Sequence, residues 1–97
     1  MTDLYPQLQH NKARILAIAA RYQAHNLRVF GSVARGEVSA DSDIDLLVAF
    51  LPTASLLDQV GLSDALSQAL GRRGDVVSSA ALNRRIRQQV LQDALLL

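Results

Sequence analysis

The chain has 97 residues, of which 49% are hydrophobic and 20% charged, and its formal net charge is +1. This length supports one domain with a single modest core and no second substrate-binding domain, and the composition is that of a folded chain rather than a disordered one. Because the chain contains no cysteine, disulfides, thiolate metal sites and a cysteine nucleophile are excluded. No signal pattern opens the chain and no apolar run approaches the ~20 residues that span a bilayer, so we expect a cytoplasmic protein without membrane contact.

In chain order, the pattern predicts alternating helices and strands. Pro6 suits a first helical position, and a recurring apolar face indicates a helix over 6–24. A strand over 27–30 and a one-turn helix over 32–35 follow, and Gly36 is expected to end that helix. The other predicted elements are a strand over 43–50 stopped by Pro52, a helix from the near capping box Ser55-x-x-Asp58 to Gly71, a strand over 73–78, and a last helix with the buried stripe Leu82, Ile86, Val90 and Ala94.

The junction between the first strand and the one-turn helix has the features of a phosphate site. Gly31-Ser32 follows Leu27–Phe30 and begins the helix, where unpaired backbone N–H groups carry a partial positive charge. Gly31 lets the backbone approach a ligand without a Cβ in the way, and Ser32 adds a hydroxyl donor.

The second predicted strand carries two carboxylates inside an apolar run. Strand alternation places Asp43, Asp45 and Leu47 on one face, with Ile44, Leu46 and Val48 on the other. The two carboxylates are then roughly 7 Å apart and repel each other, and Asp is a poor strand former. A hard divalent cation would compensate both penalties, and Mg²⁺ typically takes one or two carboxylates plus substrate phosphates.

Three segments together resemble a known signature: Gly31-Ser32, Arg35-Gly36 and Ser42-Asp43-Ile44-Asp45-Leu46. This spacing is similar to that of the DNA polymerase β-like nucleotidyltransferase superfamily, and most similar to its smallest branch, the minimal nucleotidyltransferases paired with HEPN-domain toxins. The resemblance covers nearly the whole chain. It implies one α/β (α+β) domain over 1–97, with a three-stranded mixed sheet packed with about four helices.

The resemblance also implies the chemistry of the site. In the family, a third Asp on the neighbouring strand completes the metal site, and Asp75 matches it. Family members more often carry a bulky apolar residue where Gly74 stands and Leu where Val76 stands. Asp43, Asp45 and Asp75 are thus the expected catalytic residues and ligands of two Mg²⁺ ions, and Asp75 is the expected acceptor of the proton from the attacking hydroxyl.

The nucleotide-binding set implied by the resemblance holds the triphosphate of ATP at Gly31 and Ser32. Ser42 is a candidate nucleotide or loop-positioning donor. Arg35 is expected either to reach a phosphate or to pair with Glu37 or Asp41.

The implied function is transfer of AMP from ATP to a hydroxyl, expected to be a tyrosine, of a partner HEPN toxin in a hetero-oligomer, which makes the chain an antitoxin. Two alternatives stay open: an antitoxin that neutralises its toxin by contact alone, and a nucleotidyltransferase acting on a small-molecule or RNA acceptor. Direct nucleic-acid binding is not expected.

Several exposed-looking groups have two interpretations. The basic runs Arg72-Arg73 and Arg84-Arg85-x-Arg87 are either solvated helix faces or surfaces for phosphate, nucleic acid or an acidic protein. Leu91 and Leu95 fall off the main stripe of the last helix, and they either cap the small core or form an interface.

Overall fold

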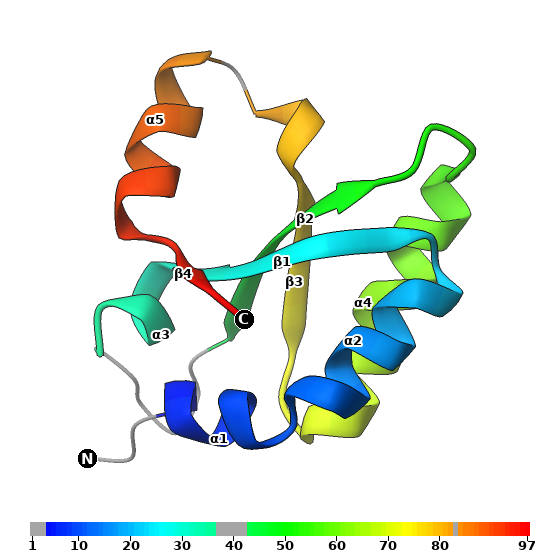
Figure 1. Cartoon of the computed structure of the whole chain (residues 1–97), viewed down its shortest axis with the longest axis horizontal. Helices are drawn as coiled ribbons and strands as arrows, with labels where there is room; N and C mark the ends of the chain where they lie inside the picture. The colour runs from blue at the N-terminus through cyan, green and yellow to red at the C-terminus, as the bar shows by residue number, and fades with distance from the viewer. Residues whose placement is uncertain (1–3, 37–42, 83) are drawn as a thin grey trace.

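The computed structural model describes residues 4–36, 43–82 and 84–97, and a four-stranded sheet lies at its centre (Figure 1). The strand order is β3-β2-β1-β4, with β2 antiparallel to β1 but parallel to β3. The sheet is therefore mixed, as expected, but it gains a short fourth strand that the sequence pattern does not predict. The bounds are β1 (Ala24–Phe30), β2 (Ile44–Phe50), β3 (Gly74–Ser78) and β4 (Leu95–Leu96).

Helices cover the sheet from two sides. α2 and α4 lie next to each other on one side of the sheet, whereas α3 and α5 lie on the other (Figure 1). Within the described residues, no helix is long and apolar enough to cross a membrane. The bounds are α1 (Leu4–His10), α2 (Lys12–Arg21), α3 (Gly31–Ala34), α4 (Leu56–Leu70), the 3-10 turn η1 (Ser79–Ala81) and α5 (Arg84–Asp93).

The core forms between the sheet and the helices α2 and α4. The alternation predicted for the second strand is confirmed on this face, because Ile44, Leu46 and Val48 are each at most 2% exposed. Leu62 and Leu66 of α4 are fully buried against the same cluster. Burial of each such side chain contributes about 1.5–3 kcal/mol to the stability of the fold. Because this face of β2 must stay in the core, the opposite face, which carries Asp45, remains for the site.

Local sequence signals set both ends of α4 as predicted. Ser55 Oγ accepts a hydrogen bond from the Asp58 N–H at 3.4 Å, and Asp58 Oδ2 accepts one from the Ser55 N–H at 2.9 Å, which completes the capping box. Gly71 ends the helix in the left-handed conformation with φ of 65°.

The prediction of one helix over 6–24 is wrong. The helix is divided at Asn11, whose backbone N–H is shared between the carbonyls of Gln7 and Leu8 at 3.2 Å each, while its side-chain amide also donates to the Gln7 carbonyl at 2.9 Å. The second part ends at Arg21, Gln23 has a positive φ of 61°, and Ala24 already pairs with Phe50 as part of β1. Sheet pairing thus overrides a helical pattern that extended too far.

The last helix is shorter than predicted. Leu82 precedes α5 in extended conformation, Val90 is half-buried, Ala94 follows the helix, and the side chain of Ile86 lies outside the described residues. The chain then turns back into β4, which pairs with Arg28 and Val29, and the Leu97 N–H donates to the Leu27 carbonyl at 3.0 Å. Leu97 is buried in the core at 4% exposure.

Candidate active site

The central feature of the site is a row of side chains across the face of the sheet opposite the core. In the strand register, Asp45 of β2 lies opposite Phe30 of β1 and beside Asp75 of β3. Neighbouring strands are about 4.8 Å apart, so Asp45 and Asp75 are adjacent on one face. Asp43 directly precedes β2, and all three aspartates are half-buried. The structure therefore brings together the three aspartates that the sequence identifies.

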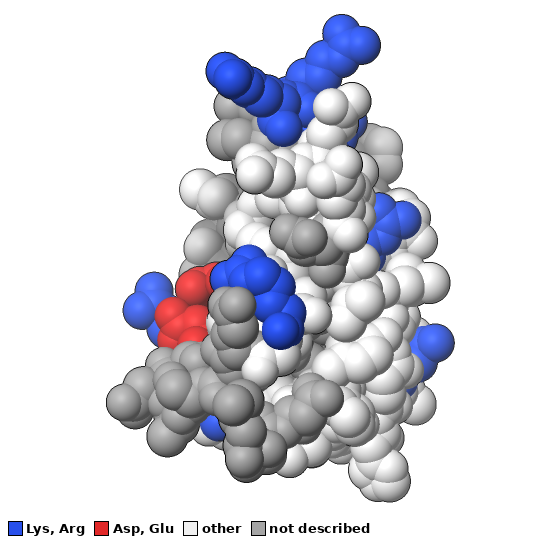
Figure 2. Space-filling model, turned by 90° about the vertical axis from the view of Figure 1, so that its left-hand side faces the viewer, with Lys and Arg blue, Asp and Glu red and all other residues white. Residues whose placement is uncertain are grey.

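Electrostatic coupling joins these aspartates. Burial raises the pKa of the Asp45 carboxyl above its usual value, the carboxylates of Asp75 and Asp43 raise it further, and the guanidinium of Arg35 lowers it. Acidic side chains gather in one small area of the surface, with basic side chains beside them (Figure 2). Three like charges and one nearby cation thus share a single small site.

The Gly31 turn belongs to this site because it touches Asp45. Gly31 begins α3 with φ of +71°, and a Cβ at this position would overlap Oδ2 of Asp45. Val33, at 1% exposure, anchors the short helix in the core, while Ser32 is half-buried. The close approach predicted at Gly31 is therefore made to a carboxylate of the site itself.

Polar side chains of α4 hold β3 in place around Asp75. Ser63 Oγ donates to the Gly74 carbonyl at 2.5 Å, and Ser67 Oγ accepts from the Gly74 N–H at 2.8 Å. Gln59 Nε2 donates to the Val76 carbonyl at 3.1 Å. These bonds satisfy the outer edge of an edge strand and fix the backbone on both sides of Asp75. The sequence analysis missed this support, although the spacing i, i+4, i+8 on a helix was a usable signal.

One exposed ion pair also touches the site. Arg73 Nε lies 3.4 Å from Asp75 Oδ1, with side-chain exposures of 75% and 40%. Exposed pairs of this kind contribute little to stability. Little free energy would therefore be lost if Arg73 left Asp75 and paired with another anion.

Two of the predicted nucleotide-binding contacts have different outcomes. Arg35 acts on Asp45 electrostatically, which places its charge near the carboxylates. Its alternative partners Glu37 and Asp41, like the candidate donor Ser42, lie outside the described residues.

The donor set suits a magnesium ion that the substrate helps to bind. Within residues 4–36, 43–82 and 84–97, no group of three or more His, Cys, Asp or Glu side chains is arranged to hold a metal ion unaided. Mg²⁺ is commonly held by one or two carboxylates together with substrate phosphates rather than by an all-protein cage. Asp45 and Asp75 on adjoining strands fit that requirement, and their mutual repulsion would be relieved by a cation.

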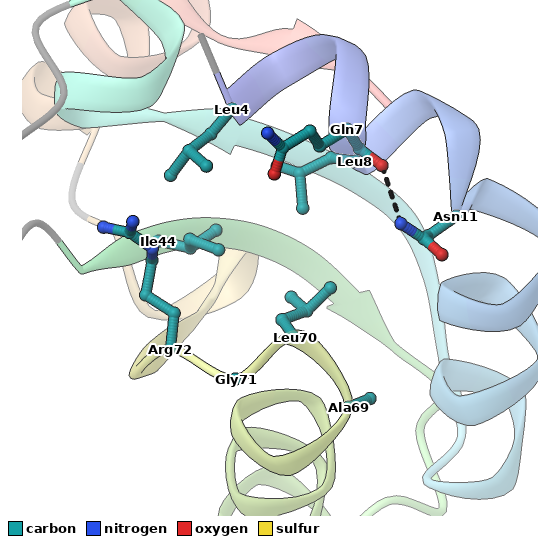
Figure 3. Close-up of a pocket in the computed structure, with 9 residues that line it drawn as sticks. All are labelled: Leu4, Gln7, Leu8, Asn11, Ile44, Ala69, Leu70, Gly71 and Arg72. Atoms are coloured by element: carbon teal, nitrogen blue, oxygen red, sulfur yellow. Dashed lines mark hydrogen bonds between the residues drawn. The ribbon is translucent and has the colours of Figure 1, made fainter. Parts of the chain in front are cut away.

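A cavity of about 230 Å³ lies elsewhere, between α1, the start of β2 and the C-terminal end of α4 (Figure 3). It opens on the core side of β2, where Ile44 points, and the described residues that line it include Leu4, Leu8, Leu70 and Arg72 but no carboxylate. The cavity is therefore separate from Asp43, Asp45 and Asp75, which we call the aspartate row, and its described lining lacks the acidic groups that phosphoryl chemistry with a metal requires.

Comparison with known proteins agrees with this fold and site. Residues 13–97 match the family described as polymerase beta, nucleotidyltransferase. The chain belongs to this family of nucleotidyltransferases. The prediction of an enzyme of this class is therefore confirmed.

Within the family, the chain is a minimal nucleotidyltransferase, as the motif spacing indicated. It is 40% identical over 73 residues to the protein adenylyltransferase MntA of Thermococcus cleftensis, covering 75% of this chain and 74% of that protein. It is 35% identical over 83 residues to a candidate protein adenylyltransferase of Methanocaldococcus jannaschii, covering 86% of this chain and 89% of that protein. A solved structure of a candidate minimal nucleotidyltransferase has a TM-score of 0.86 and 48% identity, and covers 99% of this chain and 97% of that one.

Two more distant solved structures share the fold. One is a toxin–antitoxin with AMP-PNP, with a TM-score of 0.76 and 24% identity over 89% of this chain and 71% of that one. The other is a tri-AMPylated HEPN toxin of Shewanella oneidensis in complex with an MNT antitoxin, with a TM-score of 0.68 and 22% identity over 91% of this chain and 69% of that one. These two structures therefore have the same fold as this chain.

Proposed function

We propose that this chain transfers AMP from ATP to a hydroxyl, expected to be a tyrosine, of a partner HEPN toxin and thereby acts as its antitoxin. The observation that carries the proposal is the adjacency of Asp45 and Asp75 on neighbouring strands, with the Gly31 turn in contact with Asp45. Protein adenylyltransferases among its relatives, and the AMPylated toxin in complex with a related fold, support the same reaction and the same kind of partner.

Each group of the site has a role in this reaction. The backbone of Gly31 and the hydroxyl of Ser32 bind phosphoryl oxygens of ATP, and the cationic Arg35 adds positive charge beside them. Asp43, Asp45 and Asp75 would hold Mg²⁺, which supplies charge neutralisation for the phosphates and lowers the pKa of an attacking hydroxyl. Ser42 is proposed as an additional donor to the nucleotide.

The chemical step needs little covalent work from the protein. The acceptor hydroxyl oxygen forms a bond to the α-phosphorus of ATP, the bond from that phosphorus to the pyrophosphate oxygen breaks, and Asp75 accepts the hydroxyl proton. Pyrophosphate leaves, and the acceptor carries AMP. Orientation and charge stabilisation therefore provide most of the rate enhancement.

The deciding experiment is Asp75→Asn, tested in cells that also produce the toxin. The variant keeps the size of the side chain but loses the charge and the proton acceptor, so transfer should fall by about 10²–10⁴-fold or more. The toxin should then lack the mass of added AMP, and the cells should be poisoned. Asp64→Asn, an exposed change on α4, is the matched control and should protect fully.

Two results would contradict the proposal. If Asp75→Asn protects cells and leaves the toxin unmodified, neutralisation occurs by contact. If wild type protects but AMP is found only on a small molecule or an RNA, the acceptor is of another class.

A further inference from the structure

A groove of about 220 Å³ lies on the same face of the sheet as the aspartate row. It is formed between β1, β2, η1 and α5, and we refer to it as the α5 groove. Its lining residues are Asn26, Arg28, Leu47, Ala49, Ser79, Arg87 and Leu91.

A bulge in β1 shapes the groove. His25 pairs with Ala49 and Arg28 pairs with Leu47, so β1 uses one residue more than β2 over this stretch. Asn26 lies within the bulge with φ of 52°, a left-handed conformation in which Asn is enriched. The bulge places Arg28 opposite Leu47, two residues along β2 from Asp45 and on its face, at roughly 7 Å.

The groove combines two guanidinium groups with an apolar floor. Arg87 of α5 donates from Nη2 to the Ser79 carbonyl at 2.7 Å, which holds this side chain at the rim. Arg28 is half-buried, and among the described residues the structure gives its side chain no hydrogen bond or ion pair. The floor is made of Leu47, 3% exposed, with Ala49 and with Leu91, which is 38% exposed. Because the bond to Ser79 uses only one of the five N–H donors of Arg87, both guanidinium groups and the apolar floor are available beside the aspartate row.

The size of the groove and its surroundings indicate a segment of a macromolecule. Pockets that enclose whole small-molecule ligands usually have about 300–1,000 Å³, so this groove fits one or two side chains rather than a nucleotide. Arg84 and Arg85 extend the basic surface along α5, and Lys and Arg side chains gather at the end of the molecule where α5 begins (Figure 2). Cations in the first turn of a helix oppose its dipole, so the sequence tolerates a local cost here that an anionic partner would remove.

We propose that the α5 groove docks an acidic segment of the acceptor protein and so brings its hydroxyl to the aspartate row. The inference rests on the proposed protein substrate. Carboxylates of the segment pair with Arg28 and Arg87, and an apolar or aromatic side chain packs on Leu47, Ala49 and Leu91. The floor favours a protein over an RNA because Leu47, Ala49 and Leu91 are aliphatic, whereas RNA-binding surfaces combine cationic groups for the backbone with aromatic side chains on which bases stack. Of the interpretations that the sequence leaves open for its basic runs, the proposal selects an acidic protein segment and assigns Arg87 to this groove.

Binding of labelled peptides tests the proposal without ATP or Mg²⁺. The probe is a fluorescein-labelled peptide with one tyrosine flanked by glutamates, compared by anisotropy with a peptide in which lysines replace the glutamates. Wild type should bind the acidic peptide more tightly, and Arg28→Gln and Arg87→Gln should each weaken it about tenfold, as expected for loss of one charge-assisted pair. Arg87→Lys should retain part of the affinity because it keeps the charge. Arg21→Gln, an exposed change on α2, is the control and should bind as wild type.

Failure of the inference can be distinguished from failure of the proposed function. A chain that transfers AMP to its toxin but binds both peptides equally, or binds the acidic peptide unchanged after both arginine substitutions, has another docking surface. Tighter binding of a labelled single-stranded RNA with the same dependence on Arg28 and Arg87 would make the groove an RNA site and overturn the inference.

Discussion

Gly31 and Asp45 are in direct contact, since a Cβ on Gly31 would overlap Oδ2 of the Asp45 side chain. The contact joins the start of α3 to the carboxylates on β2. The sequence suggested Gly31 for close approach to a phosphate, and in the structure it is the carboxylate of Asp45 that approaches it. In the proposed reaction, the binding of phosphate and the binding of a cation would therefore be coupled through this backbone position.

Gly31→Ala is therefore expected to impair the site more than a comparable substitution elsewhere. Gly36 is a matched control, because its φ of +72° is close to the +71° of Gly31, while nothing lies within 4 Å of the point that an added methyl group would occupy. Each Ala variant should lose about 1–2 kcal/mol of stability from the left-handed backbone. Only Gly31→Ala should also displace Asp45 and abolish AMP transfer. Thermal unfolding and transfer assays of both variants measure the two effects, and equal activities would show that the contact has no role.

Asp45→Asn should stabilise the metal-free protein at neutral pH. Because burial and the neighbouring carboxylates raise the pKa of Asp45 in the folded state above the ordinary 3.8, the folded state binds this proton more tightly than the unfolded state. Stability therefore falls as pH rises from about 3.8 through the folded-state pKa, and the ionised carboxylate is destabilising above it. Asn removes that repulsion.

The melting temperature in a chelator should accordingly rise by about 1–3 °C at pH 7.5, a small change because solvent screens the exposed part of the group. The difference from wild type should shrink as the pH is lowered toward 4. A variant that melts below wild type at pH 7.5 would mean that Asp45 makes a net stabilising contact in the absence of metal.

Much of the site follows from the sequence because it depends on short-range signals. Alternation in β2 separates Asp45 from the buried face of Leu46, and the capping box and Gly71 set the length of α4, which returns the chain to β3 beside β2. The same reasoning fails at Asn11, where the helix is divided and the side-chain amide bonds to the Gln7 carbonyl. A pattern of apolar residues contains no information about such a polar contact.

The fourth strand could not be predicted for a different reason. Leu95–Leu96 continues an apolar run that fits a helix equally well, and only pairing with Arg28 and Val29, far away in sequence, makes it a strand. The polar residues Gln59, Ser63 and Ser67 were overlooked because their partners are backbone groups of β3. Contacts between distant segments therefore account for most of what the sequence analysis missed.

The end of the chain offers a test of that long-range pairing. Leu97 is 4% exposed and donates to Leu27, whereas its neighbour Leu96 is 61% exposed. Leu97→Ala should destabilise the protein by about 2–3 kcal/mol because it removes a buried side chain from the core. Leu96→Ala should change stability by less than about 0.5 kcal/mol. Denaturant unfolding of both variants measures the difference, and similar values would place Leu97 outside the cooperative core.

Removal of magnesium provides the last prediction, because the proposed ion would relieve repulsion between Asp45 and Asp75. If Mg²⁺ binds the folded state alone with a Kd of about 1 mM, about 10 mM Mg²⁺ should stabilise the wild type by roughly 1.4 kcal/mol, which raises the melting temperature by about 6–8 °C in a domain of this size. The double variant Asp43→Asn with Asp45→Asn removes two of the three carboxylates. It should show no such rise, while Asp64→Asn, which lies on α4, should respond as wild type.

Addition of EDTA should reverse the rise in melting temperature of the wild type. A rise of the same size in the double variant would show that Mg²⁺ binds elsewhere, and an unresponsive wild type that gains the rise only with ATP present would show that the phosphates supply most of the ligands.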